Sequence, residues 1–211
     1  MEVNVKINMD NILRAYWEDN SQYNIIDTET GKKIDFLKID PEEINLEDVA
    51  IGLSNTCRFA GQLDRFYSVA EHSILVSMLV EKLMPVELNG VIESAFMHDA
   101  AEAYLGDVPT PLKVLCPGFR KIEEAFESAV GCRFGLTIGF RHPMIKEADM
   151  MLFEAERELF RGVPKEDRMH TLPDGIEIRN LAPKEALKEF MKRAEVLGIK
   201  ERDVTFATIT P

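Results

Sequence analysis

The 211 residues of the chain are enough for one domain with a sizeable hydrophobic core. A net charge of −12 argues against a broad surface for nucleic-acid polymers or anionic lipid, because both are bound through clustered Lys and Arg. The net charge does not exclude a small phosphorylated ligand, because binding one needs only a metal ion or a few cations. The three cysteines form no CxxC pair, so we expect buried thiols in a reducing compartment. No segment is typical of a signal peptide or a bilayer span, so the sequence favours a soluble, cytoplasmic protein without a membrane partner.

The first predicted element is a β-hairpin. Residues 24–37, NIIDTETGKKIDFL, alternate apolar and polar side chains around a TETGKK turn, which is typical of two paired strands. The preceding segment, MDNILRAYWEDNSQY, fits either a short helix or an extended arm. Asp40 followed by Pro41 and two glutamates indicates a helix start, and Asn45 is expected to cap a second one. The acids at these starts are interpreted as solvated helix ends.

From residue 45 onward the pattern is helical. Apolar residues recur at helical spacing in Val69–Leu83, Glu87–Leu105, a short piece after Asp107, Phe119–Val130, Ile145–Phe160 and Pro183–Leu197. The loop RGVPKEDRMHTLPDGIEIRN precedes the last helix and contains a candidate strand, IEIR. We therefore predict a mainly α protein that forms one globular unit. Residues 1–44 would form an N-terminal arm and the β-hairpin, and residues 45–211 a helical domain.

The helix expected over residues 87–105 carries polar side chains in an apolar wall. In VIESAFMHDAAEAYLG, Glu102 lies at i+4 from His98 and at i+3 from Asp99, so all three share one side of the helix. Burying these groups costs on the order of several kcal/mol unless positive charge compensates. No Lys or Arg lies within this helix. An Arg from elsewhere in the chain could compensate the buried negative charge, and a metal ion would compensate it better.

Two further residues extend this polar set. His72 lies near the start of the helix expected over residues 69–83, and Asp149 is surrounded by apolar side chains in MIKEADMMLF. Together with His98 and Asp99 they offer two imidazoles and two carboxylates, which suit Mn, Fe, Co, Ni or Zn. The other acids of the helix that carries Asp149 fall among Lys and Arg and are expected to be solvated: Glu147, Glu154, Glu156 and Glu158.

Four segments in this order resemble the HD-domain metal-dependent phosphohydrolases. They are EHS at 71–73, HDAAE at 98–102, GDVPTPLK at 106–113 and KEAD at 146–149. The H…HD…D order that defines these enzymes is met by His72, His98, Asp99 and Asp149. One HD dipeptide is a weak signal, whereas four segments in order, with E-x4-D after the HD, are specific. The similarity covers about residues 45–160 and is closest to the short 5′-deoxynucleotidases and the virus-associated deoxynucleoside triphosphohydrolases.

The resemblance implies an HD-domain helical bundle in which the four ligands hold one divalent transition metal: Co, Mn, Zn, Ni or Fe. It also implies that Glu102 and Asp107 position and activate the nucleophilic water, and that Arg58 binds phosphate. Lys113 is a second candidate for phosphate binding. Phe59 would lie near the sugar, where some relatives carry Trp, and this departure leaves selectivity between deoxyribose and ribose open.

Each of these residues also has a simpler reading. Arg58 could neutralise the acidic helix start that follows residue 45, and Asp107 could be an N-cap. Lys113 could be an ordinary helix-end lysine, and Phe59 a core side chain.

The expected function is a phosphohydrolase that removes phosphate from (deoxy)nucleoside 5′-monophosphates, a small-molecule substrate; homo-oligomerisation is left open. The alternative is a dATPase-like (deoxy)nucleoside triphosphate triphosphohydrolase, because the same metal ligands serve both reactions. An HD-type di-iron oxygenase is less favoured, since it normally uses extra histidines before the final Asp and only His142 is available there. A non-catalytic nucleotide-binding regulator could have discarded Glu102 or Asp107, and this sequence keeps both.

Overall fold

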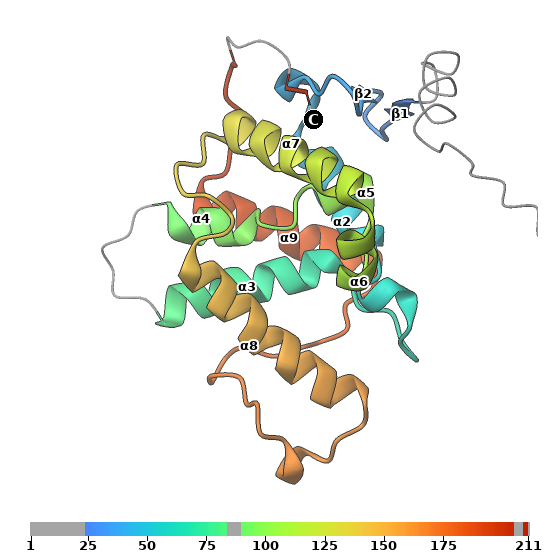
Figure 1. The fold of residues 1–211 in the computed structure, drawn as a ribbon. Coiled ribbons are helices and arrows are strands. Elements are labelled where there is room, and N and C mark those ends of the chain that lie inside the picture. The colour runs from blue at the N-terminus through green and yellow to red at the C-terminus, as the bar shows by residue number, and fades with distance from the viewer. Residues whose placement is uncertain (1–23, 84–89, 205–208, 211) are drawn as a thin grey trace, which may run out of the picture.

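The computed structural model describes residues 24–83, 90–204 and 209–210. Within these ranges the chain is mainly helical, with one two-stranded antiparallel sheet, which confirms the predicted fold class (Figure 1). The arm over residues 9–23, predicted as helix or extended chain, lies outside the described residues. The α-helices are α2 (Leu46–Asn55), α3 (Val69–Leu83), α4 (Val91–Phe96), α5 (Glu102–Leu105), α6 (Thr110–Leu115), α7 (Pro117–Phe134), α8 (Pro143–Phe160) and α9 (Pro183–Leu197).

The predicted hairpin is present and is tied to the helical domain. Strand β1 (Ile25–Asp27) pairs with β2 (Lys33–Asp35). Ile34 is buried in the main hydrophobic cluster, and Asp48 of α2 accepts hydrogen bonds from the hydroxyls of Thr28 and Thr30 and from the Thr30 amide. Asp48 is only 5% exposed, so the interpretation of this helix start as solvated is wrong for that residue.

Both predicted helix starts after the hairpin are confirmed, although the first is short. Asp40 accepts a hydrogen bond from the Glu42 amide and opens a single 3-10 turn, η2 (Pro41–Glu43). Asn45 accepts from the Asp48 amide and caps α2. Each cap satisfies a backbone N–H that the helix itself leaves without a partner.

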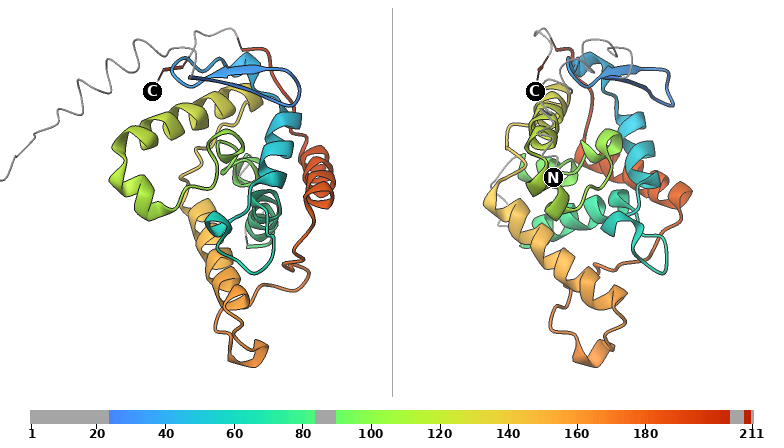
Figure 2. Two further views of the ribbon diagram at one scale, coloured as in Figure 1. Left: turned by 90° about the vertical axis from the view of Figure 1, so that its right-hand side faces the viewer. Right: turned by 45° about the vertical axis from the view of Figure 1, so that its right-hand side comes forward.

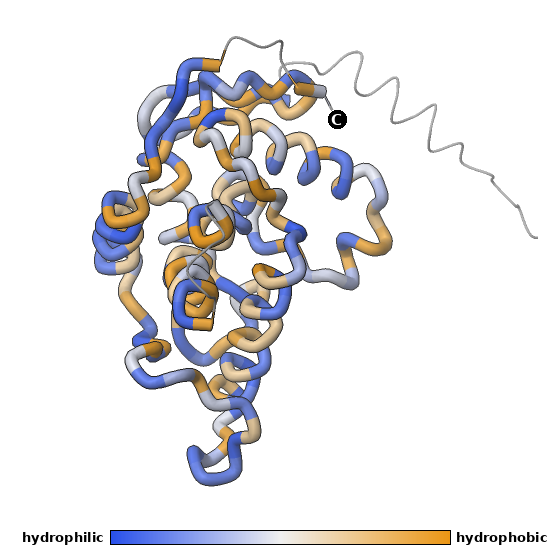
Figure 3. The backbone as a smooth tube through the Cα atoms, turned by 90° about the vertical axis from the view of Figure 1, so that its left-hand side faces the viewer, coloured by the Kyte–Doolittle hydropathy of each residue, from blue (hydrophilic) through white to orange (hydrophobic). Residues whose placement is uncertain are grey.

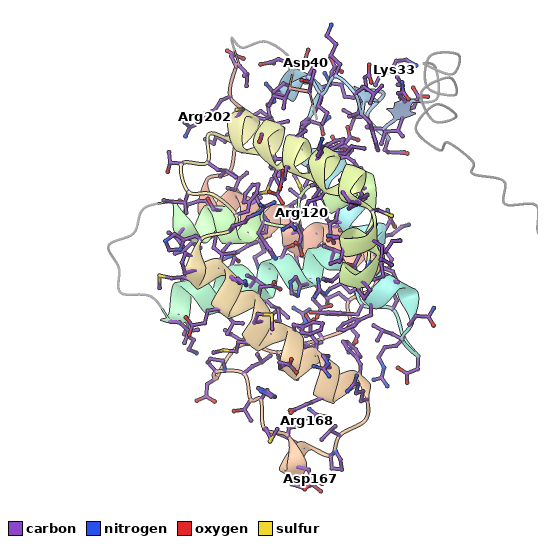
Figure 4. The ribbon with its side chains drawn as sticks, viewed as in Figure 1. Lys33, Asp40, Arg120, Asp167, Arg168 and Arg202 are labelled. Atoms are coloured by element: carbon purple, nitrogen blue, oxygen red, sulfur yellow. The ribbon has the colours of Figure 1, made fainter. Side chains whose placement is uncertain are left out.

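Helix α3 lies at the centre of the helical part and contacts α4, α8, α9 and α2. Hydrophobic and hydrophilic residues alternate along the helices (Figure 3), as expected of amphipathic helices that pack around a shared core. The hairpin and the loop between α8 and α9 lie at opposite ends of the molecule (Figure 2). Lys33 and Asp40 lie at the hairpin end, and Asp167 and Arg168 lie at the loop end (Figure 4).

The helix predicted over residues 87–105 is not continuous. Of the part that the structure describes, α4 ends at Phe96, residues 97–101 form turns, and α5 begins at Glu102. In the turns, amide groups such as those of Ala100 and Glu102 donate to the carbonyl three residues earlier instead of four. The interruption matters because His98 and Asp99 lie in it. Packing against α2 accompanies the break: a Cβ on Gly52 would lie 2.6 Å from the carbonyl oxygen of Ala103.

The remaining helix predictions differ mainly at the ends. Helices α3 and α9 have the predicted bounds, whereas α7 and α8 each begin two residues earlier than predicted, at Pro117 and Pro143. Proline is well suited to the first turn of a helix, where its missing N–H would have no partner. His142 precedes α8, and its ring nitrogen accepts from the Met144 amide.

Two smaller predictions are wrong. The IEIR segment forms no strand. Its end is held by Glu71 of α3, which is 2% exposed and accepts hydrogen bonds from the amides of residues 179–181. The thiols are free, but Cys116 and Cys132 are exposed and Cys57 is half-buried, so they are not the buried set expected. No helix among the described residues is long and apolar enough to cross a membrane.

Candidate metal centre and adjoining cavity

Three of the four predicted ligands come together from three parts of the chain. His72 lies in the first turn of α3, His98 in the turns between α4 and α5, and Asp149 in α8. One ligand atom from each lies within 4.8 Å of the others. Asp99 is the fourth, since its Oδ2 atom lies 3.2 Å from His98 Nε2 and 3.7 Å from His72 Nε2. The structure therefore brings the whole predicted ligand set to one place.

The hydrogen bonds of the two imidazoles define which nitrogen can bind a cation. His72 Nδ1 lies 2.7 Å from Glu156 Oε1, and His98 Nδ1 lies 2.8 Å from the carbonyl oxygen of Ala95. Because both partners are acceptors, each Nδ1 carries the hydrogen, and a neutral ring then has its lone pair on Nε2. Both Nε2 atoms are buried and make no hydrogen bond within the described residues. Two such nitrogens facing two carboxylates are a set that a divalent transition metal fits.

The charges around these rings favour bound cations. Burial alone would lower the pKa of His98, but the negative charge of Asp99 and their contact raise it to about 9. Burial would likewise raise the pKa of Asp99, yet the positive charges of His98, His72 and Arg58 hold it far below its usual range. Contact with His72 also lowers the pKa of Asp149, against the effect of burial. The carboxylates thus favour a proton on these rings, and a divalent cation bound at Nε2 would take the place of that proton.

Part of the buried negative charge is compensated by Arg58. Its side chain is 10% exposed, and its two terminal nitrogens lie 3.6 Å from Asp99 Oδ2 and 3.3 Å from Glu156 Oε2. Arg58 therefore does not neutralise the start of α2. Glu156 has a fully buried side chain, so its prediction as a solvated acid is wrong. The signal that could have found it is its position seven residues after Asp149, about two helical turns along the same face.

A cavity of about 690 Å³ adjoins the ligands. It is lined by most of the residues that sequence reasoning singled out, namely Arg58, Phe59, Asp99, Glu102, Asp107, Lys113 and Asp149. The lining also includes Met150, Phe153, Arg157 and Phe160 of α8, none of which the sequence analysis identified as site residues. Phe153, Arg157 and Phe160 have helical spacing from Asp149, at i+4, i+8 and i+11, so one face of α8 carries both a ligand and part of the wall.

Phe59 forms part of this cavity and not of the hydrophobic core. Its ring stacks on Phe153 with centroids 5.7 Å apart and planes 14° apart, and the Arg58 guanidinium lies 5.6 Å from the Phe59 ring centroid. Phe59 and Ala60 have φ values of 57° and 51°, in the left-handed region that non-glycine residues seldom adopt. Such strain costs on the order of 1–3 kcal/mol and tends to occur at functional sites.

Glu102 is the most unusual acid in the cavity. It is 7% exposed, its Oε2 has no partner among the described residues, and its Oε1 lies 3.4 Å from Lys113 Nζ. Burial and the negative charges of Asp99 and Asp107 raise the pKa of Glu102 well above its usual value. Asp107 caps no helix, because the cap residue of α6 is Pro109. Lys113 also lies 2.5 Å from Glu123 and so compensates two acids.

Comparison with individual known proteins identifies the family, although no protein-family model matches the chain. It is 35% identical over 181 residues to the uncharacterized protein YfdR of Escherichia coli K12, an alignment that covers 81% of this chain and 93% of YfdR. The chain belongs to the YfdR family. An uncharacterized protein of Rhodobacter capsulatus is 36% identical over 185 residues, covering 80% of this chain and 92% of that protein.

Among solved structures, a conserved hypothetical protein from Pyrococcus furiosus aligns with 70% of this chain and 96% of its own chain. The sequence identity is 20% and the TM-score is 0.34. Both relatives, from Escherichia coli and from Rhodobacter capsulatus, are described as uncharacterized.

Proposed function

We propose that the chain is a divalent-metal-dependent phosphohydrolase that removes phosphate from (deoxy)nucleoside 5′-monophosphates. One observation carries the proposal: two buried imidazoles, each with Nδ1 already hydrogen-bonded, direct unpartnered Nε2 atoms toward the carboxylates of Asp99 and Asp149. The H…HD…D order and the E-x4-D spacing, which resemble the HD-domain phosphohydrolases, support it. The adjoining cavity lies within the range of about 300–1,000 Å³ that is usual for small-molecule sites.

His72, His98, Asp99 and Asp149 would hold the metal. The bound cation would polarise a phosphoryl oxygen and lower the pKa of water toward neutrality. Arg58 faces the same cavity and is fixed by two carboxylates. In this position its guanidinium offsets negative charge on the non-bridging phosphate oxygens, the kind of electrostatic stabilisation on which phosphoryl transfer depends.

Glu102 is the proposed proton acceptor. Lys113 contacts one of its carboxylate oxygens, which leaves Oε2 to orient a water molecule and to accept its proton. Asp107 lines the same cavity and helps to orient that water. The stacked Phe59–Phe153 pair offers a flat apolar wall against which the nucleoside part of a substrate would pack.

A nucleotide panel tests the proposal. Deoxynucleoside and nucleoside mono- and triphosphates are incubated with the protein and Mn²⁺, Co²⁺, Ni²⁺, Zn²⁺ or Fe²⁺, and products are resolved by chromatography. We expect nucleoside and inorganic phosphate from the monophosphates. Release of inorganic triphosphate would instead assign the triphosphohydrolase activity, and tight binding without turnover would assign a regulator.

Two variants separate metal binding from chemistry. Asp99→Ala should lose both metal and activity, because it removes a ligand. Glu102→Ala should keep the metal and lose turnover, because its carboxylate acts on water. Glu147→Gln is the matched control, since Glu147 is an exposed acid of α8. Full activity of either test variant would contradict the assignment.

A further inference from the structure

Glu156 is a buried carboxylate to which the proposed hydrolytic mechanism assigns no role. Its side chain is fully buried on α8. Oε1 accepts a hydrogen bond from the Tyr67 hydroxyl at 2.6 Å and lies 2.7 Å from His72 Nδ1, while Oε2 lies 3.3 Å from an Arg58 nitrogen. Burial of a carboxylate away from water costs free energy, and here Tyr67 and His72 hydrogen-bond to Oε1 while the charge of Arg58 lies beside Oε2.

The position of Glu156 on α8 gives it a specific relation to the metal centre. Glu156 and Asp149 are about two turns apart on the same face of the helix. Asp149 Oδ1 lies 3.1 Å from His72 Nε2, and Glu156 Oε1 lies 2.7 Å from Nδ1 of the same ring. One helix thus contacts both nitrogens of one imidazole, and the ring cannot rotate without losing both contacts.

The contact with Glu156 also decides which tautomer of His72 is present. An acceptor at Nδ1 keeps the hydrogen on that nitrogen and the lone pair on Nε2, which faces Asp149 and lies near Asp99. A negatively charged acceptor additionally makes the ring a better electron donor at Nε2. Arg58 holds the other carboxylate oxygen, so Glu156 stays charged and oriented without being accessible to water.

We propose that Glu156 is a positioning residue that fixes the tautomer and orientation of His72 and thereby raises the affinity of the site for a divalent cation. This inference rests on the metal centre of the proposed function. An ion pair with Arg58 that served only to stabilise the fold would require neither the 2.7 Å contact with Nδ1 nor the placement of Glu156 two turns from a candidate ligand.

The test compares the Co²⁺ affinity and the visible Co²⁺ absorption spectrum of the wild-type protein with those of two variants. In Glu156→Gln the shape is kept and the charge is lost. In Glu156→Asp the charge is kept, but the shorter side chain no longer reaches Nδ1. Removal of such a partner typically weakens metal binding 10–100-fold. We expect that loss in both variants, in Glu156→Gln because the uncharged acceptor makes Nε2 a weaker donor to the metal. In Glu156→Asp the Co²⁺ spectrum should also change, because the coordinating ring is no longer held in its orientation.

Glu147→Gln, an exposed substitution on the same helix, should bind Co²⁺ like the wild type. Thermal melts in a chelator report any separate effect on the fold. If both variants bind Co²⁺ with wild-type affinity and spectrum and are only less stable, Glu156 is a core ion-pair residue and this inference is overturned, whereas the metal centre stands. If the wild-type protein itself binds no divalent metal, the proposed function fails and this inference with it.

Discussion

Replacement of Arg58 by methionine tests whether the stability of the fold depends on positive charge beside the buried acids. Arg58 is the cation between Asp99 and Glu156, and its side chain is 10% exposed. Methionine has a similar length and can fill the same space. The substitution therefore removes the charge, while most of the packing is retained, and leaves two carboxylates without their shared partner.

The expected loss of stability follows from that geometry. Removal of one partner of a buried ion pair costs about 3–5 kcal/mol, because the remaining charge is buried without compensation. In a domain of this size each kcal/mol shifts Tm by about 2–4 °C, so Arg58→Met should melt roughly 6–20 °C below the wild type in a chelator. Saturating Mn²⁺ should recover part of this loss, since the metal places positive charge beside Asp99.

The assay is thermal and urea unfolding of the wild type and the variant, each with chelator and with Mn²⁺. Arg120→Met is the matched control. Arg120 has a 63% exposed side chain whose Nε lies 3.8 Å from a Glu124 oxygen, and surface pairs of this kind contribute at most about 1 kcal/mol. If Arg58→Met were as stable as this control, the buried acids would not depend on Arg58, and the electrostatic reasoning would be refuted.

Two further predictions concern the hairpin and the cavity. Burial alone would raise the pKa of Asp48, but hydrogen bonds from Thr30 and Thr28 lower it. The contribution of Asp48 to stability should therefore be complete above the unfolded pKa of about 3.8 and decline as pH falls below it. Asp48→Asn should cost about 1.5–3 kcal/mol at neutral pH and flatten that acid dependence in urea titrations, whereas an unchanged acid profile would contradict the assignment. Phe153→Ala removes the ring that stacks on Phe59. Stacking of a base on an aromatic ring contributes about 1–3 kcal/mol, so KM for the nucleotide should rise about 5–150-fold with little change in kcat. A wild-type KM in this variant would exclude the aromatic wall as the nucleoside site.

Local signals predicted most of the fold. Helices α3 and α9 follow directly from apolar periodicity and end signals, and the TETGKK turn marks the hairpin. The interruption at residues 97–101 was missed because periodicity cannot distinguish a continuous helix from two short ones separated by tight turns. The close approach of Gly52 to Ala103 is a contact between distant parts of the chain, and no local pattern contains it.

The candidate site was predicted unevenly for the same reason. His72, His98, Asp99 and Asp149 were found because they are polar groups in apolar surroundings with a recognisable order. Glu156 was missed because its sequence neighbours are charged, and only the packed structure shows that its side chain is fully buried.

The role of Arg58 depends likewise on tertiary contacts. Its two acidic partners, Asp99 and Glu156, are remote from it in sequence, so the residues around Arg58 do not indicate which acids it contacts. Positive charge from Arg58 and Lys113 therefore supplies part of the compensation for which the sequence analysis favoured a metal ion over an Arg from elsewhere in the chain.

The metal centre is tested most directly by crystals of the protein grown with Mn²⁺ or Co²⁺ and measured at the absorption edge of that metal. We predict one anomalous peak within about 2.0–2.3 Å of the Nε2 atoms of both His72 and His98, with Asp99 and Asp149 as further ligands. A map without a peak between these side chains, at metal concentrations that saturate binding in solution, would contradict the account.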